Sequence, residues 1–517
     1  MTTTQPTDRA DAADLASFGY AQQLHRKLGP YASFAAGFSF VSILTTVFEL
    51  FGLGYSFGGA AFFWTWPLVF GGQLLVAFVF AELASRYPIS GCIYQWSRRL
   101  SNPTVGWFAG WTMLVAQIVT IAAAAIALQV VMPTIWTGFQ LVGHNPSLSS
   151  VDGATNACIL GAILIALTTT INAVGVKVMS RINSIGVTCE LIGVALLVVL
   201  LFVHAKRGPE VLFHRTGAPS GGYFGLFIVS ALMAAYVMVG FDSAGELSEE
   251  TKDPRRTAPR AIIRALCASG LGGGLLLLAA ILAAPSLTDG NLATGGLPYV
   301  LLSRLGTTVG KIFLCDVVIA ISVCTLAIQT ASTRMMFSMA RDGALPGSGL
   351  LSRVNGVTGT PIAPALLTGA LSLGLLFVNL GKPALFTDLT SACIVMLYAA
   401  YLFVTIPALI RRVRTGSLGG ETGGPGVFSL GRWGVPVNIA AVLYGGLMTV
   451  NMAWPRVSVY DPPNGGDWYL QYFSVLLLGG TALFGVAAFL WVKRGDRFAP
   501  VGASAGTTES GLIAAQA

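Results

Sequence analysis

The sequence predicts an all-α integral membrane protein with twelve transmembrane helices. Of its 517 residues, 54% are hydrophobic and only 10% are charged, whereas soluble domains contain about 25% charged residues. Long apolar segments recur along the chain, and each has roughly the 20 residues that a helix needs to cross a bilayer. The net charge of +8 comes from basic residues in short segments between the apolar runs. There they set membrane topology, so the charge does not indicate nucleic-acid binding.

The expected spans follow a polar leader over residues 1–30, which we expect to lack order as far as Asp14. This leader is too long for a signal peptide and has no clear cleavage site. The apolar runs place the spans at 34–60, 62–86, 105–135, 155–174, 181–204, 223–247, 259–284, 308–340, 361–380, 386–410, 435–454 and 472–492. They form one domain over residues 31–495. A Gly-rich loop is expected at 416–426, and a loose tail at 496–517.

The distribution of basic residues orients these spans. With the N-terminus inside, 23 of the 30 Lys and Arg residues lie on the inner side and 7 on the outer side. The positive-inside rule and the even number of spans then place both termini in the cytoplasm. The exception is the segment between the fifth and sixth spans, which carries Lys206, Arg207 and Arg215 outside.

Two spans, the first and the sixth, carry polar interruptions beside glycines. Residues 42–49 bring hydroxyl groups and the carboxylate of Glu49 into the first span, and residues 240–245 bring Asp242 and Ser243 into the sixth. A carboxylate within the membrane costs about 2.5–3.5 kcal/mol on insertion scales and usually faces a cavity. Matched interruptions in two halves predict a transporter site at the interface of inverted repeats. The alternative for the sixth span is a kinked helix with an exposed acidic end.

Three sets of motifs give the chain a resemblance to a known family. They are residues 38–45 with 81–85 and 87–91, residues 240–244 with 249–256 and 258–260, and residues 340–346 with 352–355 and 360–361. Through these motifs the sequence from Leu24 to about Val492 resembles the amino acid–polyamine–organocation permease superfamily. Within that superfamily it is most similar to the amino acid/choline transporter group, which includes GABA permeases. The motifs are specific to the group and not to one substrate.

The resemblance implies the leucine-transporter fold, with inverted repeats of five helices at about 31–206 and 220–413 and two further helices at about 434–494. Helices one and six would be broken, and the break in helix one would hold a substrate carboxylate. Tyr236 occupies the place of an aromatic gate, and Asp242 matches an acidic position in some relatives. The substrate-binding residues expected on this basis are Ser42, Thr45, Thr46, Val47, Glu49, Tyr236, Val239, Gly240 and Asp242.

The sequence departs from this pattern at three acids. Glu49 stands where GABA-permease-like relatives have a small hydroxyl residue, Glu190 aligns with a lysine of some proton-coupled relatives, and Glu246 follows the sixth-span break. These acids favour an amine-bearing substrate, and Glu190 is the first candidate for coupling to protons. Ser322 and Thr325 are further coupling candidates, on an expected ion-binding face. Each has a structural alternative: Glu49 and Glu190 as hydrogen-bonded packing acids, and the hydroxyls as donors within their own helix.

These observations predict a secondary active permease of the plasma membrane that works by alternating access. A GABA-like ω-amino acid is the favoured substrate and protons the favoured coupling ion, with Na⁺ as the alternative. The competing hypotheses are a permease for polyamines, choline or ethanolamine, an amino acid exchanger and, in another class, a nutrient sensor or channel.

An enzyme is not expected, because the sequence contains no phosphate-binding loop, HExxH or GxSxG motif. No cofactor, catalytic residue or metal site is predicted, and the seven cysteines lie singly, as packing residues do.

Overall fold

The computed structural model of the chain describes residues 6–219, 222–378, 380, 385–419, 427–460 and 467–494. Within these ranges the chain forms helices and their connections, with no β-strand. The tail expected at 496–517 and most of the Gly-rich loop expected at 416–426 lie outside the described residues.

Each predicted span falls on one helix or on a pair of consecutive helices. In chain order these are α2 (Pro30–Val41) with α3 (Ile43–Gly58), α4 (Thr65–Arg86), α6 (Pro103–Ile126) with α7 (Leu128–Ile135), α8 (Val151–Val174), α9 (Val176–Val203), α10 (Tyr223–Val237) with α11 (Ser243–Glu246), α12 (Pro254–Ala283), α13 (Gly290–Arg341), α15 (Ile362–Val378), α16 (Leu385–Thr415), α17 (Gly434–Ala453) and α20 (Phe473–Arg494). The shorter helices are α1 (Pro6–Ser17), α5 (Cys92–Leu100), α14 (Ser348–Leu351), α18 (Val457–Tyr460) and α19 (Trp468–Gln471).

The apolar character of these helices confirms an all-α membrane protein. By length and composition, nine helical stretches in the described part of the chain could cross a membrane, and the first of them runs through α2, α3 and α4. Two shorter apolar helices, α10 and α15, accompany them. The outer face of α9 exposes Ile185, Ile192 and Val199 at intervals of two turns. Such an apolar face suits a lipid environment, because the helix makes its backbone hydrogen bonds internally and needs no polar partner from the lipid.

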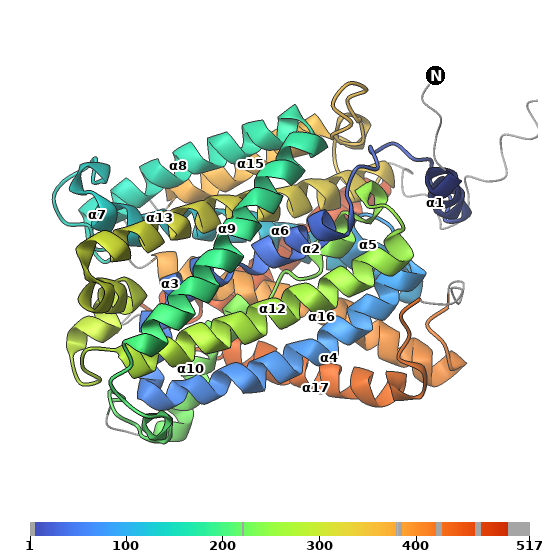
Figure 1. The fold of residues 1–517 in the computed structure, drawn as a ribbon. Helices are drawn as coiled ribbons and strands as arrows, with labels where there is room; N and C mark the ends of the chain where they lie inside the picture. The colour runs from blue at the N-terminus through green and yellow to red at the C-terminus, as the bar shows by residue number, and fades with distance from the viewer. Residues whose placement is uncertain are drawn as a thin grey trace, which may run out of the picture.

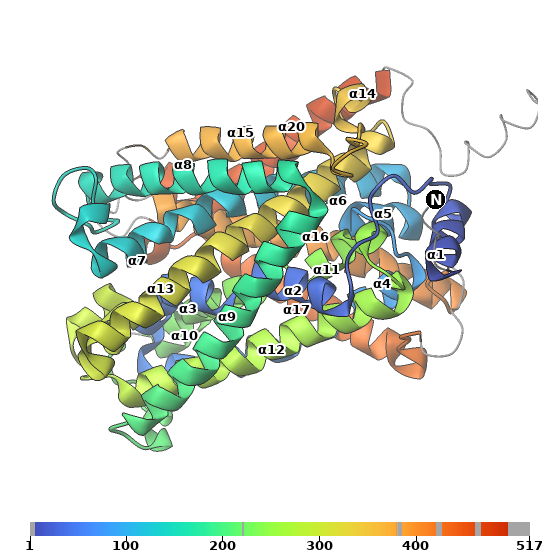
Figure 2. The same cartoon turned by 45° about the horizontal axis from the view of Figure 1, so that its top comes forward.

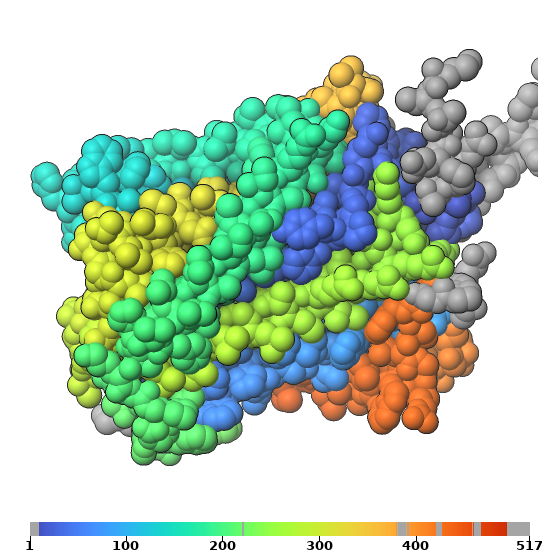
Figure 3. Space-filling model, in the orientation of Figure 1, coloured from blue at the N-terminus to red at the C-terminus, as the bar shows by residue number. Residues whose placement is uncertain are grey.

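The long helices lie side by side, and α9 crosses the bundle diagonally (Figures 1 and 2). The broken first span lies at the centre, because α2 packs against α9, α12 and α13 and α3 packs against α10 and α13. In Figure 3 the blue first span reaches this surface only between α9 and α12. Every residue of α2 from Ala35 to Val41 is buried. Polar groups at its end are therefore shielded from lipid.

Glycines allow the helices around this centre to approach closely. A Cβ on Gly270 of α12 would lie 2.3 Å from the ring of Phe70 on α4, and one on Gly273 would lie 2.4 Å from Trp66. Because lipid provides no hydrophobic drive for helix association, such close packing supplies much of the attraction. The abundance of glycine in the sequence thus reflects contacts between helices.

The N-terminal leader differs from its prediction. We expected no order before Asp14, but residues 6–17 form α1, which lies at one end of the bundle (Figure 1). The reason is external support, since Asp14 forms an ion pair with Arg255 of α12. Burial raises the pKa of Tyr20, so its hydroxyl keeps its proton and donates to Asp342 Oδ1 at 2.9 Å. We call this end of the bundle the inner end, because the charge pattern predicts that it is cytoplasmic.

Candidate functional site

The first span breaks at a single residue, Ser42. Its φ of 36° lies in the left-handed region, a conformation that costs a non-glycine residue about 1–3 kcal/mol. The break ends α2 and begins α3, so the first amides of α3 point away from the helix without intrahelical partners. Ser42 caps this new N-terminus, since its hydroxyl oxygen accepts a hydrogen bond from Thr45 N at 3.4 Å. The sequence-predicted interruption is thus present where residues 42–49 indicated it.

Glu190 of α9 meets this N-terminus. Its Oε1 accepts hydrogen bonds from Leu44 N and from the Ser42 hydroxyl, both at 3.0 Å. Its Oε2 is buried without a hydrogen-bond partner among the described residues. The carboxylate of Glu190 therefore takes the position at the α3 N-terminus that the resemblance reserved for a substrate carboxylate.

The sixth span breaks between Val237 and Ser243, and a tyrosine of α16 supports the break. Gly240, with φ of 89°, donates its backbone N–H to the Tyr401 hydroxyl oxygen at 2.9 Å. The Tyr401 hydroxyl in turn donates to Asp242 Oδ1. Ser243 Oγ donates to the carbonyl of Ala36 on α2 at 2.9 Å, so the segments below the two breaks are joined. Tyr401 had not been singled out in the sequence, where it is one of several aromatic residues of a long apolar run.

We expect Gly240→Ala to destabilise the protein. A Cβ at this position would lie 1.8 Å from the ring of Phe40, and the left-handed backbone would cost about 1–2 kcal/mol in addition. Thermal unfolding of the purified protein should show a Tm lowered by several degrees. The matched control is Gly71→Ala in α4, where a Cβ meets nothing within 4 Å. Equal Tm values for the two variants would contradict the strain argument.

A small cavity lies between the two broken spans. It is lined by Phe40, Thr45, Thr46, Glu49, Thr120, Ala124, Tyr236, Val239, Cys324 and Ile328. Its free volume of about 10 Å³ is near the minimum that one water molecule needs. A substrate larger than water would therefore require the lining helices to move apart.

Glu49 is the most unusual residue of the cavity. Both of its carboxylate oxygens are buried, and in the described part of the chain neither has a hydrogen-bond partner. A buried carboxylate without a partner is costly unless a cation or a proton joins it. The hydrogen-bonded packing role that the sequence left open for Glu49 finds no partner among those residues.

The structure brings some of the predicted site residues together and separates others. Thr45, Thr46, Glu49, Tyr236 and Val239 line the cavity. Ser42, Gly240 and Asp242 form the backbone breaks and their hydrogen bonds, and Val47 is buried beside the site without lining it. Thr120 of α6 and Cys324 of α13 had not been predicted, because nothing in the sequence shows which face of those apolar helices turns inward.

The two remaining coupling candidates bond within their own helix. Ser322 Oγ donates to Val318 O and Thr325 Oγ1 to Ile321 O, each at 2.8 Å. These are the bonds of the structural alternative. It is Cys324, between them, that reaches the first span, with its Sγ 3.5 Å from the carbonyl of Phe40.

Below the breaks, two buried ion pairs join the α11 side to α13. Glu249 pairs with Arg341 at 2.8 Å and Glu250 with Arg334 at 2.9 Å. Arg341 also lies over the ring of Tyr20, 3.9 Å from its centroid. The inner end is therefore closed by charges that are paired with one another and covered by the N-terminal segment.

Comparisons with known proteins agree with this architecture. The family model described as amino acid permease matches residues 28–480. The chain is 30% identical to the amino-acid permease BAT1 of Arabidopsis thaliana over 466 residues, which covers 85% of this chain and 88% of the relative. It is 25% identical over 443 residues to a protein of Macrophomina phaseolina named for amino acid/polyamine transport, with 83% and 95% covered. It is 27% identical over 348 residues to the methylthioribose transporter of Bacillus subtilis, with 65% and 70% covered.

Proposed function

We propose that this chain, which belongs to the amino acid permease family and is thus an integral membrane transporter of amino acids or related amines, carries a GABA-like ω-amino acid. The binding site would be the cavity between the broken spans, exposed to either side in turn by alternating access. The observation that carries the proposal is the carboxylate of Glu49 in that cavity, which has no hydrogen-bond partner among the described residues and lies on the helix whose N-terminus follows the break. The protein would lie in the cell membrane with both termini inside.

The spacing along α3 supports an ω-amino acid over an α-amino acid. Leu44, whose amide belongs to the helix N-terminus, and Glu49 are five residues apart, which corresponds to about 7.5 Å of helical rise. The Glu49 side chain tilts back toward the N-terminus and shortens this gap. A carboxylate and an ammonium at opposite ends of a short chain fit such a gap, whereas those of an α-amino acid share one carbon.

The contacts of Glu190 support proton coupling. An ionised Glu190 occupies the Leu44 amide and the Ser42 hydroxyl with charge-assisted hydrogen bonds. Protonation would weaken these bonds and release the amide for a substrate carboxylate, so proton binding would precede substrate binding. Sodium coupling through Ser322 and Thr325 has less support, because both hydroxyls donate within α13.

A second candidate function is the transport of a cationic amine such as a polyamine, choline or ethanolamine. The specific observation in its favour is that Glu190 already accepts the hydrogen bond of the Leu44 amide at the α3 N-terminus, so that the cavity would offer a substrate the negative charge of Glu49 in place of that amide. Under this hypothesis Glu190 would remain ionised throughout the cycle. The two candidates differ in whether the substrate must carry a carboxylate.

Uptake into proteoliposomes tests both candidates. We expect labelled GABA to enter saturably in sodium-free buffer, faster with an inward proton gradient, and to be displaced by other ω-amino acids but not by putrescine, choline or ethanolamine. Arginine and neutral α-amino acids complete the competitor set. Entry of labelled putrescine without GABA would favour the amine permease, and a flux that does not saturate would indicate a channel.

A further inference from the structure

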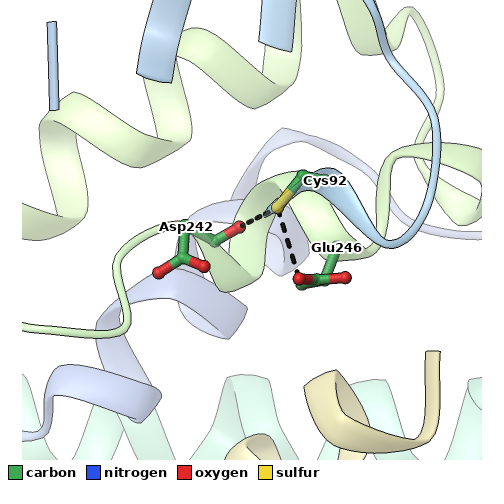
Figure 4. Close-up of side chains that lie close together, drawn as sticks. All are labelled: Cys92, Asp242 and Glu246. Atoms are coloured by element: carbon green, nitrogen blue, oxygen red, sulfur yellow. Dashed lines mark hydrogen bonds between the residues drawn. The ribbon is translucent and has the colours of Figure 1, made fainter. Parts of the chain in front are cut away.

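A cysteine and two acids meet outside the lining of the cavity between the broken spans. Cys92 is the first residue of α5, Asp242 immediately precedes α11 and Glu246 ends α11, and one donor atom from each lies within 4.8 Å of the others. Figure 4 shows the Cys92 Sγ between the main-chain oxygen of Asp242 and the carboxylate of Glu246. All three residues are fully buried. They come from segments about 150 residues apart in sequence, so no local sequence motif predicts the cluster.

Two oxygens of this cluster have unused acceptor capacity. Asp242 Oδ2 and Glu246 Oε2 are buried without a hydrogen-bond partner among the described residues. Over the same ranges, the acids in ion pairs at the inner end include Asp14, Glu249, Glu250 and Asp342, and none of these pairs uses Asp242 or Glu246. Buried carboxyl groups are paired with a cation, neutralised by a proton, or bound to a metal. The neighbouring thiol distinguishes this cluster from an acid pair that only shares protons.

The spacing of one pair of ligand atoms is compatible with a tetrahedral metal site. Cys92 Sγ and Glu246 Oε1 are 3.3 Å apart, and a tetrahedral zinc ion separates a sulfur and an oxygen ligand by about 3.5 Å. Cys92 Sγ also lies 3.7 Å from the main-chain oxygen of Asp242. Cys92 begins a helix, so the positive end of the α5 dipole favours negative charge at its sulfur. One sulfur with two carboxylates suits zinc or cadmium, whereas calcium and magnesium require more oxygen ligands.

We propose that Cys92, Asp242 and Glu246 form a binding site for a thiophilic divalent cation, and that its occupation inhibits transport. The inhibition rests on the proposed function and on the elements that the site connects. Cys92 belongs to α5, which packs mainly against α6 and α16, whereas Asp242 precedes α11 and Glu246 ends it, and α11 packs against α2, α12 and α13. Metal bonds would fasten these two groups of helices together and oppose opening at the inner end.

Metal binding can be measured on the purified full-length protein without any substrate. Addition of Cd²⁺ should produce the ultraviolet charge-transfer absorption of a cadmium thiolate, and Zn²⁺ should displace it. Cys92→Ser should abolish the absorption, and Glu246→Gln should weaken Cd²⁺ binding by at least about tenfold, which corresponds to about 1.4 kcal/mol. The matched control is Cys158→Ser, since Cys158 is also buried and lies 3.3 Å from a main-chain oxygen, that of Leu376.

The outcomes separate the parts of the proposal. A cadmium absorption that persists in Cys92→Ser, or that is absent from the unaltered protein, would overturn the site. If thermal unfolding shows that Cys92→Ser is not folded, the loss of Cd²⁺ binding in Glu246→Gln and the competition by Zn²⁺ test the site instead. In proteoliposomes, Zn²⁺ should inhibit uptake by the unaltered protein at least about tenfold more strongly than uptake by Glu246→Gln. Binding without inhibition would overturn the link between α5 and α11, and absence of any uptake would count against the permease alone.

Discussion

Glu49→Gln is expected to raise the KM for amine-bearing substrates by at least about 30-fold, because removal of one partner from a buried charge pair costs about 2–5 kcal/mol. The substrate ammonium would lose the carboxylate that Glu49 contributes to the cavity, and the neutral amide would leave the rest of the lining unchanged. Initial rates of labelled GABA uptake into proteoliposomes, measured over a range of concentrations, give the KM.

Two further measurements show whether this effect comes from binding or from folding. The Tm of Glu49→Gln should equal or exceed that of the unaltered protein, because the substitution removes a buried carboxylate that has no partner among the described residues. Butyrate, which lacks the amine of GABA, should bind both proteins with similar affinity in competition assays. An unchanged KM for GABA would remove Glu49 from the substrate site.

Glu190→Gln is expected to abolish accumulation driven by a proton gradient. With one proton carried per substrate molecule, a gradient of one pH unit provides about 1.4 kcal/mol and supports about tenfold accumulation. The glutamine cannot titrate, so the ratio of inside to outside substrate should fall to about one. Labelled substrate concentrations at steady state, with and without the gradient, give this ratio.

The internal control for Glu190→Gln is exchange. Labelled substrate should still enter vesicles that are preloaded with unlabelled substrate, because exchange requires a site that opens to both sides but no net proton movement. Retained tenfold accumulation would show that the proton is carried elsewhere. Loss of exchange together with accumulation would instead assign Glu190 a structural role at the α3 N-terminus.

The spans and their breaks could be predicted because each has a local cause. A membrane helix requires a run of apolar residues, and a polar segment with glycines, such as 42–54 or 240–245, interrupts that run. The order of α1 could not be predicted in this way. Its support comes from Arg255, which lies about 240 residues away in sequence.

The details of the candidate site could not be predicted either, because they depend on contacts between residues that are distant in sequence. The bond from Leu44 N to Glu190, the bond from Gly240 N to Tyr401 and the approach of Cys92 to Glu246 each join residues about 150 apart. The residue types of Glu190, Gly240 and Glu246 suggested possible roles at the site, but Tyr401 and Cys92 were not singled out, and one sequence contains no information about which partners meet. The orientation of a uniformly apolar helix such as α6 is similarly hidden, and Thr120 was missed for that reason.

The backbone hydrogen bonds between the segment before α2 and the segment after α11 have a mechanical consequence. Leu28 N donates to Glu250 O and Lys252 N donates to Leu28 O, each at 2.9 Å. These bonds hold the inner halves of the two broken spans together, so we expect α2 and α11 to move as one rigid unit about their breaks. This unit can then move away from α13 only when the Glu249–Arg341 and Glu250–Arg334 salt bridges break. The free energy needed to break these two salt bridges would limit how often the inner end opens and releases the substrate.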